Sequence, residues 1–173
     1  MPVNNPKELF VQLLSGLRQG TERSASVYQE ISKLAEDPDV KEALEARAFV
    51  SANVLATLDQ CFKLIGEQPM KVSSPLRDTM VEVFRRELAE IQNPAARRLF
   101  ILVKAIHLAH LRVAEYIALV EAADVTGHYG VGVLLESCLA NKLAFVERTR
   151  RLIRNVIETK VANKIAEKEA VLA

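Results

Sequence analysis

Two histidines three positions apart, His107 and His110, are the clearest candidate metal ligands in the sequence. On a helix, residues at this spacing share one face, and two imidazoles there could bind Zn²⁺ or Fe²⁺. A metal site needs further ligands, and the expected neighbours add only Thr21 and Glu22. The spacing therefore favours histidines that are interior or half-exposed and hydrogen-bonded to neighbouring groups, with a metal site as the alternative.

Three basic residues occupy positions where the helical pattern calls for apolar ones. Arg47, Arg112 and Lys142 each stand near the middle of a largely apolar helix face. Cations there would repel a divalent metal, and burying them is costly unless they are paired. The stripe around the first of them consists of Val40, Leu44, Arg47, Ser51, Val54, Leu58, Cys61 and Ile65.

The buried cations need partners, and the sequence offers several acids. We hypothesise that Arg47 pairs with Glu22 or a neighbouring acid. The other two cations are expected to reach Glu115, Glu136 or a helix carbonyl. Alternatively, the long side chains extend outward, so that their charged ends meet solvent.

Other catalytic patterns do not emerge from the sequence. No strand-turn-helix elbow exposes a serine, and no strand precedes the glycines at 127, 130 and 132, which are more typical of a turn into a helix. Cys61 and Cys138 both fall in apolar stripes and are predicted to be reduced core thiols of a cytosolic protein. The sequence therefore predicts no enzyme and no cofactor.

Proline residues mark the helix starts. Asn5-Pro6, Asp37-Pro38, Ser74-Pro75 and Asn93-Pro94 each place proline after a favourable N-cap residue. Gly66 and Gly127 are suited to helix C-termini. The pattern predicts helices over residues 6–35, 38–66, 75–92, 95–125 and 129–160, and no strand. The tail 161–173 is expected to fray.

Composition limits the class of protein. A chain of 173 residues, half hydrophobic and a quarter charged, is typical of a single globular domain over 1–173. A net charge of +1 argues against nucleic-acid binding. The basic cluster of Arg148, Arg150, Arg151 and Arg154 is expected to be a solvated helix face. No apolar run approaches the ~20 residues that span a membrane, and no signal peptide is visible, so we expect a cytoplasmic location.

The connections favour an all-α, ferritin-like four-helix bundle. Short links make residues 6–66 and 95–160 two antiparallel hairpins, and residues 66–93 provide a long crossover containing one additional helix. A plain up-down bundle remains the alternative. The inner face of the fourth helix is expected to carry Val103, His107, His110, Ala114 and Ile117. That of the fifth is expected to carry Leu135, Cys138, Asn141, Lys142 and Phe145.

Four local segments resemble one known family over roughly residues 8–155. They are Leu9 to Ser15, Glu42 to Ala46, His110 to Tyr116 and Leu134 to Leu139. On these segments the chain resembles the YciF/YciE-type ferritin-like proteins, which are bacterial and stress-associated. The resemblance implies two helical hairpins with a crossover helix, often assembled as a homodimer.

The family's usual metal-site positions carry different residues in this chain. Its helix 1 glutamate falls on Thr21, and its helix 2 histidine and acid fall on Arg47 and Val50. Its Glu-His-x-Glu motif falls on Ala109, His110 and Arg112, and its last acidic pair falls on Asn141 and Lys142. Only His110 matches, so the resemblance does not carry a di-iron site to this chain.

Three functions follow as hypotheses. The first is a non-enzymatic structural or interaction protein, a metal-free homodimer associated with stress. The second is an iron-binding protein that uses His107 and His110, with Glu22 as a further ligand. The third is a helical module that binds a small apolar ligand in a partly vacated core.

Overall fold

Five helices make up the fold. The computed structural model describes residues 3, 5–35, 37–73 and 75–172, with side chains described at all of these except 75–78, 81 and 160–172. The helices are α1 (Pro6–Leu34), α2 (Pro38–Ile65), α3 (Pro75–Glu90), α4 (Pro94–Val125) and α5 (Tyr129–Leu172). The predicted ends are confirmed to within two residues, except at the end of α5.

The predicted N-caps of three helices are confirmed. The side chains of Asn5, Asp37 and Asn93 each accept a hydrogen bond from the amide three residues further on, at 2.9, 3.1 and 3.0 Å. Proline follows each cap, where its missing N–H costs nothing. The fourth predicted cap, Ser74, lies outside the described residues.

Two glycines close the C-termini of α2 and α4, as predicted. Gly66 and Gly127 have φ angles of 70° and 78°, in the left-handed region that a Cβ disfavours. Each amide bonds back to a carbonyl of the preceding helix, those of Lys63 and Asp124. These turns set the chain direction for the segments that follow.

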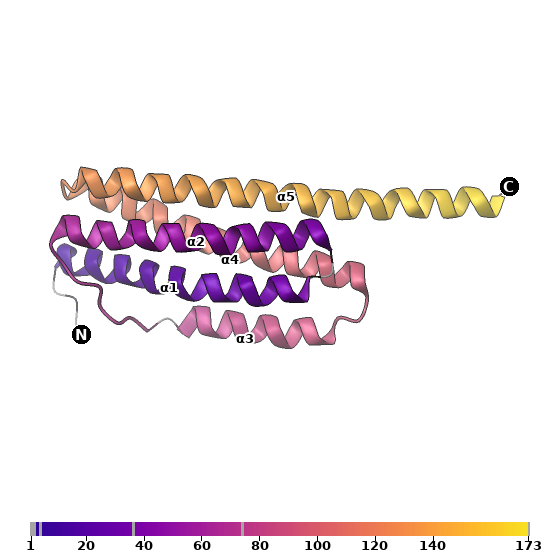
Figure 1. Ribbon diagram of the computed structural model, residues 1–173, viewed down its shortest axis with the longest axis horizontal. Coiled ribbons are helices and arrows are strands. Elements are labelled where there is room, and N and C mark those ends of the chain that lie inside the picture. The colour runs from indigo at the N-terminus through magenta and orange to yellow at the C-terminus, as the bar shows by residue number, and fades with distance from the viewer. Residues whose placement is uncertain (1–2, 4, 36, 74, 173) are drawn as a thin grey trace.

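The end of α5 differs from the prediction. The helix continues to Leu172, so the predicted end at residue 160 is wrong, and residue 173 lies outside the described residues. The segment is rich in Ala, Lys and Glu, which are strong helix formers, and it extends a helix that is already nucleated. Figure 1 shows this part of α5 projecting beyond the other helices.

The helices form the predicted all-α, ferritin-like bundle. The α1–α2 hairpin packs beside the α4–α5 hairpin, through α1 against α4 and α2 against α5. Residues 66–93 return along the bundle, so that α2 and α4 run in the same direction (Figure 1). The crossover topology therefore holds and the plain up-down alternative is wrong.

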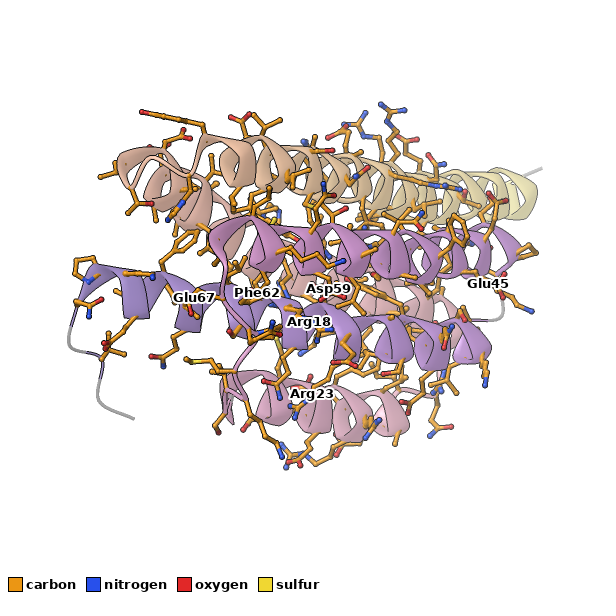
Figure 2. All side chains as sticks on the ribbon, turned by 60° about the vertical axis from the view of Figure 1, so that its left-hand side comes forward. Arg18, Arg23, Glu45, Asp59, Phe62 and Glu67 are labelled. Carbon is orange, nitrogen blue, oxygen red and sulfur yellow. The ribbon has the colours of Figure 1, made fainter. Side chains whose placement is uncertain are left out.

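Polar pairs fix helices on the outside of the bundle. Arg18 of α1 and Asp59 of α2 face each other in Figure 2, with Nε 2.5 Å from Oδ1. The crossover helix α3 lies on α4, where the rings of Phe84 and Phe100 stack with centroids 5.8 Å apart. The half-exposed pairs contribute little stability and mainly orient the helices.

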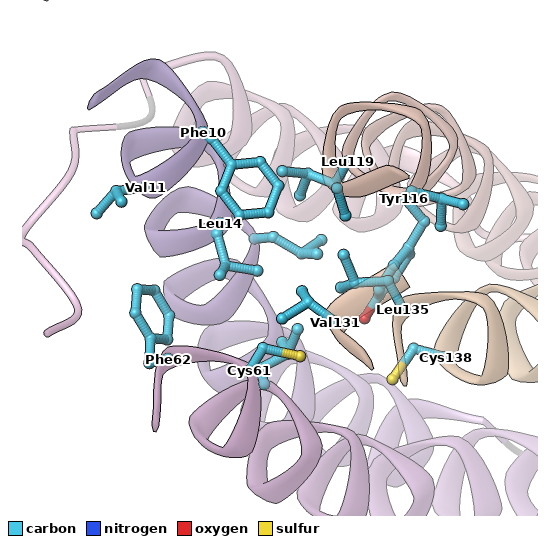
Figure 3. Close-up of a cluster of buried hydrophobic side chains, with 14 of the residues drawn as sticks. Phe10, Val11, Leu14, Cys61, Phe62, Tyr116, Leu119, Val131, Leu135 and Cys138 are labelled. Carbon is cyan, nitrogen blue, oxygen red and sulfur yellow. The ribbon is translucent and has the colours of Figure 1, made fainter. Parts of the chain in front are cut away.

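Two apolar clusters fill the two halves of the bundle. The first surrounds Leu14, Leu58, Tyr116 and Leu135 and appears in Figure 3. The second surrounds Tyr28, Leu44, Ile101 and Phe145. At ~25 cal/mol per Å² of buried apolar surface, these clusters provide the main favourable term in folding. On each of α1, α2, α4 and α5, a buried polar or charged residue lies between the two clusters.

Two helices are long and apolar enough to cross a membrane by length and composition. They are α2 and the part of α5 from Tyr129 to Thr159, so the expectation that no segment approaches this length is wrong. A core helix of a globular protein meets the same criterion. Each of these two helices carries a buried cation, Arg47 in α2 and Lys142 in α5, near its middle.

Candidate functional site

A buried basic layer crosses the middle of the bundle. Its members come from the four main helices and are only 1–3% exposed: Thr21 on α1, Arg47 on α2, Arg112 on α4 and Lys142 on α5. Along each helix the layer residue lies between members of the first and second apolar clusters. Side chains from α2, α4 and α5 therefore bring three cations into one region.

Local helix geometry holds the polar neighbours of the layer. Thr21 donates its hydroxyl to the Leu17 carbonyl at 2.9 Å. Ser51 donates in the same way to the carbonyl of Arg47 at 3.0 Å. Because these hydroxyl protons are used within their own helices, Thr21 and Ser51 offer only lone pairs to other groups.

Arg47 has no hydrogen-bond partner for two of its nitrogens. Among the described residues, nothing accepts from Nε or Nη2, and both atoms are buried. The predicted pair with Glu22 is wrong, because Glu22 lies on the exposed side of α1, 3.6 Å from Arg18. Instead, the guanidinium lies over the ring of Phe145, 5.7 Å from its centroid. Burial lowers the pKa of Arg47.

Arg112 has the acid that the sequence predicted. Its Nη1 pairs with Glu115, one turn further along α4. The contact satisfies only part of the guanidinium, since Nη2 is buried with no partner among the described residues. Glu115 is partly exposed and connects the layer to the bundle surface.

Lys142 is the most enclosed of the three cations. Removal of the ammonium from water lowers its pKa well below the ordinary value, and the charges of Arg47 and Arg112 lower it further. The charges of Cys138 and Glu115 act in the opposite direction. A lysine in these surroundings loses its proton more easily than a surface lysine.

Two buried tyrosines border the layer. Burial raises the pKa of both Tyr28 and Tyr116, so each hydroxyl keeps its proton. The hydroxyl of Tyr116 lies near Thr21 and Cys138 but makes no hydrogen bond within the described part of the chain. Figure 3 shows Tyr116 and Cys138 in the first cluster. Tyr116 was not among the residues expected on the inner face of this helix, although it stands one turn after Arg112.

The histidine pair does not belong to the layer. His107 and His110 are exposed, so the predicted inner face of α4 is wrong. The true inner face runs through Ala105, Ala109, Arg112 and Tyr116. Helix α4 is apolar on several sides, and the predicted stripe is two residues out of phase with the true one.

The remaining predicted positions divide between the layer and the surface. Ala109 is buried next to the layer and Val50 is half-buried against the first cluster. Asn141 is exposed, whereas its neighbour Lys142 faces inward. The cluster of Arg148, Arg150, Arg151 and Arg154 is exposed as expected.

A groove of about 420 Å³ leads from the surface to one side of the layer. Tyr28 and Arg112 lie at its inner wall. Arg23, Arg85 and Glu82 line its outer part, between α1, α3 and α4. The groove gives solvent and small solutes access to the edge of the layer.

The five-helix fold defines a ferritin-like helical protein. A family model matches residues 5–162 of the chain. The chain belongs to the family described as "Domain of unknown function (DUF892)". No curated protein matches the chain.

Solved structures confirm the predicted resemblance to YciF-type proteins. The E. coli stress protein YciF superposes with a TM-score of 0.85 at 16% identity, covering 90% of this chain and 99% of that one. YcfI from Rhodopseudomonas palustris gives 0.82 at 20% identity, covering 86% and 94%. A protein from Xanthomonas campestris gives 0.69 at 16% identity, covering 92% and 99%. At these identities the likeness establishes the shared fold.

The layer does not fit the di-metal centre that ferritin-like bundles commonly hold. Such a centre takes inward glutamates and Glu-x-x-His pairs from facing helices. Here the inward positions carry two guanidinium groups and an ammonium group, which repel a dication. Within the described part of the chain, no three His, Cys, Asp or Glu side chains gather in a way that could hold a metal ion.

Proposed function

We propose that the protein is a non-enzymatic structural member of its family, with a bundle centre that does without a di-metal site. The observation that carries the proposal is the burial of Arg47, Arg112 and Lys142 in the basic layer. Buried glutamates need a metal to offset their mutual repulsion, whereas this layer has lost those acids and gained positive charge. YcfI, which shares the fold, is described as a candidate structural protein.

Metal loading tests the proposal directly. Protein purified without chelator is incubated with Fe²⁺ under anaerobic conditions, desalted and subjected to elemental analysis. We expect iron far below one ion per chain in the wild type. Near-stoichiometric iron that is lost in His110→Ala, and retained in the control His128→Ala, would overturn the proposal. That result would establish the iron-binding alternative, in which His107 and His110 chelate the metal from the exposed face of α4.

We propose that the protein assembles as a homodimer through the α1–α2 face. Phe49 is 71% exposed on that face, beside a hollow of about 570 Å³ that Ala25, Ala48 and Ala52 help to line. In a two-fold dimer, a projecting ring and a neighbouring hollow are self-complementary, because each Phe49 can enter the partner's hollow. Sedimentation equilibrium tests this: the wild type should be a dimer and Phe49→Glu a monomer. A monomeric wild type would refute the assembly.

A cytoplasmic location and an association with stress complete the proposal. Both rest on the resemblance to the stress protein YciF and on two buried thiols in reduced form. Immunoblots of cell fractions, before and after osmotic and oxidative stress, test both at once. We expect the protein in the cytoplasmic fraction, with higher abundance after stress. Unchanged abundance under both conditions would remove the association with stress.

A further inference from the structure

The donors of the basic layer outnumber the acceptors that face them. Four buried donor atoms have no partner among the described residues: Arg47 Nε, Arg47 Nη2, Arg112 Nη2 and Tyr116 Oη. Buried polar atoms in folded proteins are almost always paired, and leaving one unpaired costs about 1–3 kcal/mol. Four such atoms in one region indicate that an acceptor from outside the chain belongs there.

The charges point to an acceptor that carries negative charge. Two guanidinium groups and an ammonium group meet in the layer, and their ion pairs within the described residues involve the single carboxylate of Glu115. The charges of Arg47 and Arg112 also act on Tyr28 and Tyr116 and favour a lower pKa of both, so the two cations lie near both tyrosine hydroxyls. An anion of one or two charges would balance the excess.

We propose that the basic layer is a binding site for a small oxyanion, held by Arg47, Arg112, Lys142 and the Tyr116 hydroxyl. A guanidinium offers donors in a planar fork that matches two oxygens of a phosphate, sulfate or carboxylate group. The tyrosine keeps its proton and donates to a third oxygen, and the ammonium adds a further donor. Apolar clusters lie on both sides of the layer, so the polar partners of the anion would come from the layer itself.

The groove between α1, α3 and α4 supplies a route to this site. Its inner wall contains Arg112, which also belongs to the layer. Arg23, Arg85 and Glu82 line the outer part of the groove, where Arg85 pairs with Glu30 at 2.7 Å. The charges at the entrance therefore largely balance, and the preference for an anion comes from the cations of the layer.

The site goes beyond the structural role proposed above and has a separate test. Thermal unfolding of the wild type is followed in a buffer free of oxyanions, with added sodium phosphate, sulfate or acetate. Sodium chloride at matched ionic strength controls for general salt effects. We expect a saturable rise in Tm with at least one oxyanion, because a ligand of the folded state stabilises it by mass action. Equal shifts with all salts, chloride included, would overturn the site.

Substitutions locate the effect. Arg47→Met and Lys142→Met remove donors while keeping side-chain volume, and both should abolish the oxyanion-specific rise in Tm. The matched control Arg148→Met, which alters an exposed arginine paired with Glu42, should retain it. An oxyanion-specific rise that survives in Arg47→Met would place the anion elsewhere and refute the proposal.

Tyr116→Phe is expected to keep the fold, and it distinguishes a hydroxyl without a partner from one that binds an anion. If the hydroxyl has no partner, its loss stabilises the protein and leaves the oxyanion response unchanged. If it binds an anion, its loss weakens the apparent affinity in calorimetric titration by ~3- to 10-fold, the value of one hydrogen bond. Unchanged affinity in Tyr116→Phe would contradict the site as drawn.

Discussion

The guanidinium of Arg47 on α2 lies over the ring of Phe145 on α5, with 5.7 Å between Cζ and the ring centroid. This contact takes the place of the carboxylate pair that a buried arginine usually has. A desolvated cation–π contact contributes up to ~2 kcal/mol, whereas the desolvation of an ion costs several kcal/mol. Without a bound anion, Arg47 therefore destabilises the fold.

Arg47→Met should accordingly stabilise the protein. Methionine fills a similar volume, packs against Phe145 and removes an unpaired charge from the core. We expect the free energy of unfolding, from urea denaturation in oxyanion-free buffer, to rise by about 1–4 kcal/mol. Most core substitutions lower it, so the sign of the change is itself diagnostic.

The exposed arginine of α5 gives the matched control for this change. Arg148→Met removes a pair with Glu42 that is half-exposed on both sides. This substitution should change the free energy of unfolding by no more than ~1 kcal/mol. If Arg47→Met destabilises while Arg148→Met is neutral, then Arg47 has a stabilising partner and the interpretation of the layer fails.

Lys142 should make stability depend on pH. Its folded pKa is lowered, by burial first and then by Arg47 and Arg112, while the nearby Cys138 and Glu115 act in the opposite direction. Between the lowered pKa and the unfolded value of ~10.4, the unfolded chain binds more protons than the folded one. Stability of the wild type therefore rises with pH across this window and falls as pH decreases.

Lys142→Met isolates that contribution. The variant should be more stable than the wild type at neutral pH. The difference between their free energies of unfolding, called the gap below, should narrow as pH rises towards 9. Burial raises the pKa of Cys61 to about 12, so this thiol also makes stability depend on pH, above its unfolded pKa. Because the wild type and the variant both contain Cys61, its contribution cancels in the difference between them. Urea denaturation at pH 7, 8 and 9 measures the gap, and a constant gap would show that Lys142 keeps its proton throughout.

The sequence was sufficient for most of the fold because its signals are local. Asn5, Asp37 and Asn93 each precede a proline and cap a helix in the structure. The lengths of the helices and the short links between them then determine two hairpins and a crossover. The end of α5 was missed because frayed tails and helical extensions share a composition rich in Ala, Lys and Glu.

The site was predicted only where the helical phase was unambiguous. On α2, polar residues flank one apolar stripe, and Arg47 faces inward as expected. Helix α4 is apolar on several sides, so the stripe through His107 and His110 and the one through Arg112 and Tyr116 both fitted the pattern. Tertiary contacts with α1 and α5 select the second. The partner of Arg47 was not predictable, because Phe145 is close to it only after α2 and α5 pack.

The left-handed glycine that ends α2 should be required for stability. Gly66 has φ 70°, where a Cβ is strained, although nothing lies within 4 Å of the added atom. Gly66→Ala should lower the free energy of unfolding by about 1–2 kcal/mol through backbone strain alone. Gly16→Ala is the matched control inside α1, where the added Cβ would meet only Val72 at 3.9 Å. It should raise stability by about 0.5–1 kcal/mol, and equal losses in both variants would point to steric crowding instead.

The two thiols should be protected from modification in the folded protein. Burial raises the pKa of Cys61 to about 12 and raises that of Cys138 as well, so thiolate is scarce at pH 8. The positive charges of Arg47 and Lys142 reduce the shift at Cys138 without reversing it. A colorimetric disulfide reagent at pH 8 should label neither thiol in the native state and both in guanidinium chloride, because only the thiolate reacts. Cys61→Ser and Cys138→Ser, each carrying a single thiol, assign the signal to one residue. Rapid native labelling of either variant would show that the first apolar cluster opens to solvent far more readily than its packing implies.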